Sequence, residues 1–224
     1  MQIKACQNEG QLWSDFCSRC GAEADGHVRS PIYFDSSFSI KMPLTPDSYT
    51  PPSEWKNLLF QLQILSPRYA EQDYEAVKGS APNIRNVFGP TNNWPHSDIS
   101  FDENLADLRR HESEFVERIA FAYAILDPHG KHYLGCIYVK PIKSKIDNDQ
   151  RKLNFQAQVF FWLSSLQSQI AAEDALARLK LWFAESWPFA KVAFPGREID
   201  WSIWEAMAFE ANGTFLSEKY TYQR

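Results

Sequence analysis

The feature that most constrains the fold is a strand, helix and strand pattern in the second half of the chain. Residues 156–163, QAQVFFWL, are β-branched and aromatic and are typical of a buried strand. Residues 171–185 carry apolar side chains at helical spacing, and residues 189–194, FAKVAF, form a second apolar run. This order predicts a βαβ unit with parallel strands and a right-handed connection. Ligands bind at the carboxyl end of the first strand in such units, so residues 164–172 are the first candidate site.

The candidate loop carries a divergent form of a known motif. It reads Gln167-Ser-Gln-Ile-Ala-Ala172, and the chain from about residue 55 onward resembles the GCN5-related N-acetyltransferase (GNAT) superfamily. That family binds the pyrophosphate of acetyl-CoA through the motif Gln/Arg-x-x-Gly-x-Gly/Ala. Gln167 and Ala172 match the outer positions, whereas Ile170 stands where the first glycine belongs. Backbone N–H groups must turn toward the phosphates there, and a β-branched residue resists the positive φ that glycine permits.

The resemblance implies an α/β (α+β) fold with a central mixed sheet flanked by helices. Strands 156–163 and 189–194 are expected to be parallel and splayed at their carboxyl ends. Acetyl-CoA is the implied co-substrate, and its acetyl group would pass to an amine of an acceptor that the sequence does not identify. The residues expected to hold the cofactor lie at the end of the first strand and in the loop: Leu163, Ser164, Ser165, Gln167, Gln169, Ile170, Ala171 and Ala172.

The reacting groups are harder to assign. In the family, the acid that protonates the thiolate is often a tyrosine four residues before a glycine in the helix after the second strand. The matching residue here is Phe209, before Gly213, and phenylalanine cannot donate a proton. Tyr220 is a candidate substitute, with packing in the core or at a sheet edge as the alternative. His96 is the candidate on the substrate side, because its loop borders the acceptor cleft in the family.

Two function classes therefore stay open. The order of elements favours an N-acetyltransferase, whereas Ile170 and Phe209 favour a catalytically degenerate GNAT-fold binding or interaction protein.

Trp201 and Trp204 either pack on the sheet or line a channel for pantetheine. The charged residues of the expected helices, His111 among them, are expected on solvated faces. Arg197 and Glu198 are expected to form a local ion pair.

The remaining strands are predicted in other parts of the chain. Residues 58–65 alternate like a strand, and residues 120–126 and 133–139 flank a turn, Asp127-Pro-His-Gly130, which predicts a hairpin. Residues 143–152 are predicted to be a charged, flexible connection. Tyr220 and Tyr222 are predicted to lie on a strand that follows the last helix, and the usual final strand of the family has no obvious counterpart.

Two helices are predicted between the first strand and the hairpin. Ser66 and Pro67 have the pattern of an N-cap followed by a first-turn proline, before a helix over residues 69–77. Ser100 precedes the second helix, and Glu103 completes the pattern of a capping box.

The amino-terminal part is distinguished by its organisation and by a candidate metal site. Its prolines predict that residues 1–53 form an extension packed on a domain of residues 54–224. Cys17 and Cys20 are candidate metal ligands, with other nearby residues available, but no second Cys-x-x-Cys pair follows. Ordinary reduced thiols are the favoured interpretation, and a structural zinc is the alternative. Cys136 is expected to be a small core residue.

Composition limits the partners. The 224 residues carry a net charge of −5 and no basic stripe, so nucleic acid and anionic membranes are not expected partners. No apolar run approaches the roughly 18–20 residues that span a bilayer, and the amino terminus lacks a signal-peptide core. The sequence therefore predicts a cytoplasmic protein. The resemblance implies a small-molecule or amine-bearing substrate, and a homodimer is left open.

Overall fold

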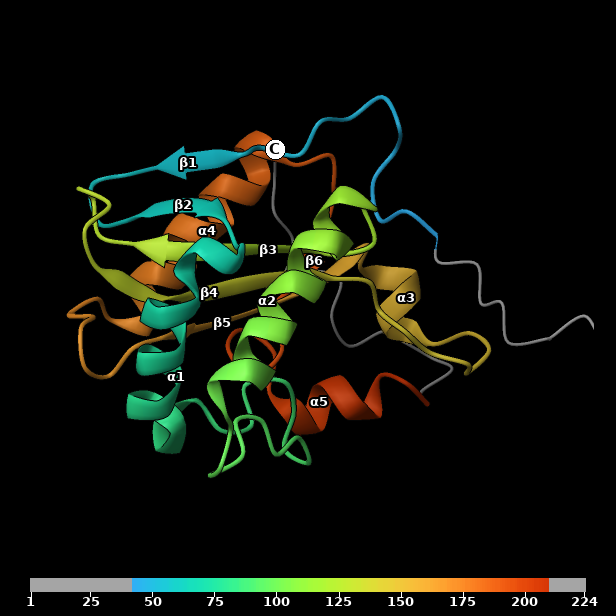
Figure 1. Ribbon diagram of the computed structural model, residues 1–224. Coiled ribbons are helices and arrows are strands. Elements are labelled where there is room, and N and C mark those ends of the chain that lie inside the picture. The colour runs from blue at the N-terminus through green and yellow to red at the C-terminus, as the bar shows by residue number, and fades with distance from the viewer. Residues whose placement is uncertain (1–41, 210–224) are drawn as a thin grey trace, which may run out of the picture. The chain divides into compact units, whose positions relative to one another are not determined.

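The protein is described by a computed structural model that covers residues 42–209. These residues form one six-stranded sheet with helices on both faces (Figure 1). Strands follow one another in the sheet in chain order, and all neighbours are antiparallel except β5 and β6, which are parallel. The predicted fold class, a mixed sheet flanked by helices, is confirmed. Within the described part of the chain, no helix has the length and apolar character that a membrane crossing needs.

The strands are short at both edges and long in the centre: β1 Glu54–Lys56, β2 Gln61–Ile64, β3 Phe121–Leu126, β4 Tyr133–Lys140, β5 Ala157–Leu163 and β6 Val192–Ala193. The helices are α1 Ala70–Ile84, α2 Phe101–Val116, α3 Gln150–Asn154, α4 Ala172–Ser186 and α5 Trp201–Ala206, and a 3₁₀ turn, η1 Pro67–Tyr69, precedes α1.

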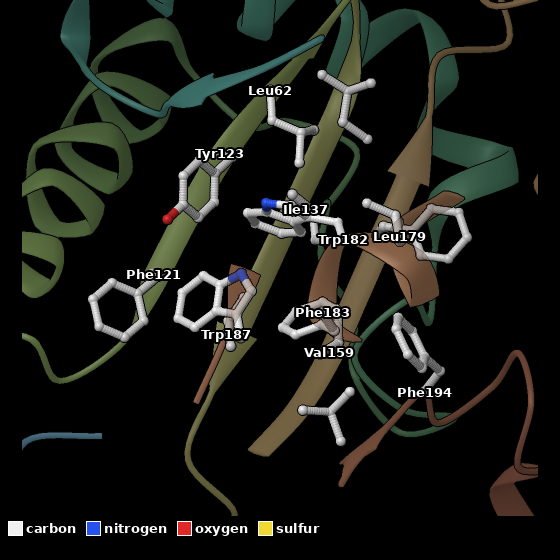
Figure 2. Packing of buried hydrophobic residues seen from close by; sticks show 14 of the residues in the cluster. Leu62, Phe121, Tyr123, Ile137, Val159, Leu179, Trp182, Phe183, Trp187 and Phe194 are labelled. Carbon is white, nitrogen blue, oxygen red and sulfur yellow. The ribbon is translucent and has the colours of Figure 1, made fainter. Parts of the chain in front are cut away.

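Both faces of the sheet are buried, which explains why the central strands read as continuous apolar runs. In β3, Phe121, Tyr123 and Ile125 point into one core and the alternate residues point into the other. Helix α4 closes the first core with Leu179, Trp182 and Phe183 (Figure 2). Helices α1 and α2 lie side by side over the opposite face (Figure 1).

Local sequence signals gave several elements correctly. Ser100 and Glu103 form the predicted capping box, with each side chain bonded to the other's backbone N–H. The Asp127 carboxylate accepts hydrogen bonds from the N–H groups of Lys131 and His132, which closes the predicted hairpin turn between β3 and β4. Cys136 is fully buried, as expected, and burial raises the pKa of its thiol.

Other expectations were wrong in detail. Ser66 makes no side-chain capping bond, and the helix after it extends to Ile84. The connection over residues 143–152 is not wholly irregular, because Asp149 caps the short helix α3 and binds Arg151. The second strand of the βαβ unit spans two residues instead of six. β1 was not predicted.

Part of the predicted extension is tied to the domain. The Arg118 guanidinium donates to the Thr45 hydroxyl at 3.0 Å and to the Tyr49 carbonyl at 2.6 Å. The Tyr49 hydroxyl in turn donates to the Ser186 carbonyl at the end of α4. The proposed boundary at residue 53 stays a prediction, and Cys17 and Cys20 lie outside the described residues.

The backbone around Gly135, in the hairpin of β3 and β4, leaves no room for a side chain. Gly135 has φ of 149°, and a Cβ there would overlap the backbone carbonyl of Trp162 on β5. We expect Gly135→Ala to lower the free energy of unfolding by about 3 kcal/mol, because strain and a backbone clash add. Gly130→Ala is the control: its φ is 72°, but its nearest neighbour is the movable Gln61 side chain, so we expect about 1 kcal/mol. Urea denaturation of both variants measures this, and equal losses would contradict it.

Candidate functional site

The candidate site lies where β5 and β6 separate. Their parallel pairing joins Ala157 to Val192 and Gln158 to Ala193, and it ends there. A turn over residues 194–197, closed by the Arg197 N–H bonding to the Phe194 carbonyl, then redirects the chain. β5 itself continues to Leu163, so its carboxyl half has no β6 residue beside it. The strands are therefore parallel, as predicted, and paired only at one end.

The direction of the free backbone groups on β5 follows from its other neighbour. The Ser164 N–H donates to the Leu134 carbonyl at 2.7 Å, which places the backbone groups of Ser164 on the β4 side. Because backbone groups alternate along a strand, those of Phe161 and Leu163 point to the β6 side. The Arg197 guanidinium donates to the Phe161 carbonyl at 3.4 Å, which is consistent with this direction. The N–H groups of Phe161 and Leu163 are thus strand donors that β6 does not use.

A cavity of about 220 Å³ occupies this region. Its walls come from β5, the turn after β6, the start of α5 and the segment after α1: Asn83, Ile84, Arg85, Asn86, Val87, Phe160, Phe161, Pro195, Gly196, Arg197 and Trp201.

Trp201 forms one wall because Gly196 leaves room for it. Gly196 has φ of 73°, and a Cβ at this residue would overlap the Trp201 indole. The Trp201 ring stacks on Phe160, with centroids 6.1 Å apart and planes 14° apart. Trp204 instead lies buried in a small core cluster with Phe155. Of the two tryptophans, Trp201 lines a cavity and Trp204 is packing.

The cavity carries uncompensated positive charge. Neither Arg85 nor Arg197 forms an ion pair with a carboxylate in residues 42–209. The expected pair of Arg197 with Glu198 is wrong, because Glu198 binds Lys180 on α4. Partial burial lowers the pKa of Arg197, and the Glu173 carboxylate opposes that shift. The guanidinium therefore lies within electrostatic range of the first turn of α4.

The predicted loop between β5 and α4 is anchored on α1. The Ser165 N–H donates to the Ser80 hydroxyl at 3.0 Å, and that hydroxyl lies 3.3 Å from the Ser164 hydroxyl. Leu166 packs so closely over Gly79 that a Cβ there would overlap it. The N–H groups of Ser164 and Ser165, two of the expected cofactor donors, are thus already used inside the protein.

Ile170 does not obstruct the loop in the expected way. Its side chain is half-buried and packs against the α4 core, and its φ is not positive. Its N–H donates to the Ser168 hydroxyl at 3.2 Å. The expected donors whose N–H groups have no bond recorded within residues 42–209 are Leu163, Gln167, Gln169, Ala171 and Ala172. Ala171 provides no side-chain cap, which leaves the start of α4 open.

The candidate reacting residues are not gathered at this cavity. His96 lies in the loop before α2, where Nδ1 is 2.9 Å from an Asp98 carboxylate oxygen, and it does not line the cavity. Phe209 is 77% exposed. Tyr220 lies outside the described residues. In residues 42–209, no group of three or more His, Cys, Asp or Glu side chains is arranged to hold a metal ion.

Sequence reasoning missed the residues that shape the cavity. Arg85 and Arg197 lie far apart in the chain, and only the fold brings both to the open edge of β5. The proline and glycine at residues 195 and 196 were a usable signal, since they mark where the second strand must end.

Comparisons with known proteins give similarity at the level of solved structures. No family model matches the chain, and no curated protein matches it. The chain is similar to the microcin C7 self-immunity acetyltransferase MccE, solved with acetyl-CoA and AMP, at 14% identity over 74% of this chain and 89% of that one, with a TM-score of 0.46. It is similar to a RimL ribosomal L7/L12 α-N-protein acetyltransferase, solved with coenzyme A, at 15% identity over 64% and 72%, with a TM-score of 0.46. It is also similar to an acetyltransferase from Salmonella typhimurium that modifies the N-terminal serine of protein L7/L12, at 15% identity over 62% and 71%, with a TM-score of 0.43.

The anchoring of the loop can be tested through Ser80. Ser80→Ala removes the buried acceptor of the Ser165 N–H, so we expect the free energy of unfolding to fall by about 1–2 kcal/mol. Ser113→Ala is the control, because its hydroxyl bonds only at the exposed surface of α2, and we expect a loss below about 0.5 kcal/mol. Urea denaturation measures both, and a Ser80 loss no larger than the Ser113 loss would show that the loop is not held there.

Proposed function

We propose that the open edge of β5 binds the pantetheine arm of an acyl-CoA and that the protein is an N-acetyltransferase. The observation that carries this proposal is a β5 edge with unused strand donors, Phe161 and Leu163, where Phe161 lines a cavity that also holds two arginines without a carboxylate partner in residues 42–209. An extended ligand that contains amide groups can bond to a strand edge as an added strand does. The pantetheine arm of coenzyme A is such a ligand.

The charge distribution supports a phosphate-bearing ligand. Arg85 and Arg197 supply cations in a chain whose net charge is −5. The open N–H groups at the start of α4 add donors and the positive end of the helix dipole. Glu173 and Asp174 in that first turn compete for the same dipole. We therefore expect CoA to bind in the micromolar-to-millimolar range, roughly −8 to −4 kcal/mol.

In the proposed reaction the amine nitrogen of the acceptor attacks the thioester carbonyl of acetyl-CoA. A C–N bond forms, the C–S bond breaks, the amine loses a proton and the departing thiolate gains one. Phe209 cannot supply that last proton, and it is exposed to solvent. The phenylalanine at residue 209 favours a second candidate function, an acyl-CoA-binding protein that does not catalyse transfer. Release of free thiol from acetyl-CoA in the presence of amines distinguishes the two.

Arg197 provides the sharpest test of cofactor binding. Arg197→Met keeps an apolar stem beside Phe161 but removes the charge, so we expect CoA affinity to fall about tenfold, or 1.4 kcal/mol. Arg178→Met is the matched control, because Arg178 is an exposed residue of α4 that does not line the cavity. Titration calorimetry with CoA measures both variants.

Two outcomes of this titration would contradict the proposal. One is the absence of any heat with wild-type protein at millimolar CoA. The other is an equal loss of affinity in the Arg178 and Arg197 variants, which would indicate general charge attraction instead of a site at the β5 edge.

A further inference from the structure

A second cavity, of about 240 Å³, lies between α1, α2 and β4 on the face of the sheet opposite α4. Helices α1 and α2, which lie side by side over this face of the sheet (Figure 1), both contribute lining residues. Asp73 of α1, Asn104 of α2 and Lys140 of β4 contribute polar groups, and Phe88 and Tyr138 contribute aromatic surface.

Asp73 is a buried carboxyl with neutral partners. It is 3% exposed, and it accepts hydrogen bonds from the Tyr133 hydroxyl at 2.5 Å and the Asn104 amide at 2.9 Å. No cation of residues 42–209 forms an ion pair with it. Burial raises the pKa of Asp73 to about 6, and the two hydrogen bonds oppose that shift. The Asp73 carboxyl thus has two hydrogen-bond donors and no cation paired with it in the described part of the chain.

Lys140 lines the same cavity and carries a charge of the opposite sign. Its ammonium lies 4.3 Å from the ring centroid of Phe88 and 5.2 Å from that of Tyr138. No carboxylate or carbonyl of residues 42–209 is recorded as a hydrogen-bond or ion-pair partner of this ammonium. Burial lowers the pKa of Lys140 to about 8, with the nearby Arg110 acting in the same direction. The two rings hold the ammonium in place by cation–π attraction and leave its N–H donors unused.

The remaining charges on this wall are already paired. Arg110 binds Asp107 at 2.8 Å and Glu114 at 3.3 Å. His111 is buried against Tyr138 and lies 3.3 Å from Glu114, so the expectation that it lies on a solvated face was wrong. Asp73 and Lys140 are therefore the two groups on this wall that carry opposite charges and have no direct ion-pair partner in residues 42–209, although the Asp107 and Glu114 carboxylates still act to raise the pKa of Lys140.

We propose that this cavity binds a small zwitterion, an α-amino acid or a close analogue, with its ammonium toward Asp73 and its carboxylate toward Lys140. A buried charge without a partner is costly, so a ligand that carries both complementary charges gains from each end. The volume admits a small molecule and excludes a folded partner.

The position of the cavity gives this ligand a role in the proposed reaction. The two cavities are neighbours: the Phe88 ring lines the second cavity and packs on Tyr138 at 5.0 Å and on Phe160 at 5.4 Å, and Phe160 lines the first cavity. The amine of the zwitterion would then be the acetyl acceptor. That role depends on the proposed acetyltransferase function, whereas binding of the zwitterion does not.

The test uses the full chain without CoA at pH 7.5. Titration calorimetry compares L-alanine and L-leucine with L-alanine amide, which lacks the carboxylate, and L-lactate, which lacks the amine. We expect at least one amino acid to bind at millimolar concentration and both capped or deaminated analogues to bind at least tenfold more weakly.

Lys140→Met should weaken amino-acid binding at least tenfold. Lys78→Met is the matched control and should leave it unchanged, because Lys78 also lies over an aromatic ring, that of Tyr74, but on the exposed side of α1. The ligand comparison stands on wild-type protein alone if the Lys140 variant fails to fold.

Three results would overturn the proposal: no binding of either amino acid, equal binding of the analogues, or unchanged affinity in a folded Lys140→Met protein. The separate CoA titration keeps the two proposals distinguishable. Amino-acid binding without CoA binding would retain this site and reject its role as the acceptor site, and the reverse would retain the cofactor site alone.

Discussion

The arrangement of the candidate site depends on how briefly β5 and β6 pair. Two residues of each strand face one another, and the turn after β6 then carries the chain away while β5 continues beside β4. Backbone groups buried at a strand edge need partners, so the structure must cover this edge or leave it for a ligand. Arg197 covers one carbonyl, that of Phe161, and Phe160 and Phe161 are the β5 residues that border the cavity.

Charged residues line both cavities, and they differ in whether they have an ion-pair partner in the described chain. Some ionic groups of the helices have partners on the same helix, as Arg110 and Glu114 do on α2. Arg85, Arg197 and Lys140 line the two cavities without a recorded carboxylate partner in the described chain. Phe88 lines the second cavity and packs on Phe160, which lines the first. One cavity thus combines cations with backbone donors, and its neighbour combines two separated charges of opposite sign.

Local interactions account for what could be predicted from the sequence. The capping box at Ser100 and the hairpin turn at Asp127 involve residues a few positions apart, so their chemistry is visible in the sequence. The βαβ unit was visible because its core residues recur at helical and strand spacing. The three-residue strand β1 is too short and too exposed to carry such a pattern.

The site itself was less predictable because its contacts are long-range. The loop after β5 was located correctly, but its anchor is Ser80, 85 positions before Ser165. The sequence has Ile170 at the position where the resemblance leads one to expect a glycine, and it cannot show that the side chain packs against the core. Asp73 and Lys140 are ordinary charged residues in the sequence, and only the packing of α1 on β4 brings them to one cavity.

Amide hydrogen exchange at the β5 edge, measured by NMR with and without CoA, tests most directly whether this edge is the cofactor site. We expect CoA to slow exchange of the Phe161 and Leu163 N–H groups, which β6 does not pair. The Ser164 N–H, already bonded to Leu134, should change little and serves as the internal reference. Unchanged exchange at both residues in the presence of millimolar CoA would contradict the claim that this strand edge is the cofactor site.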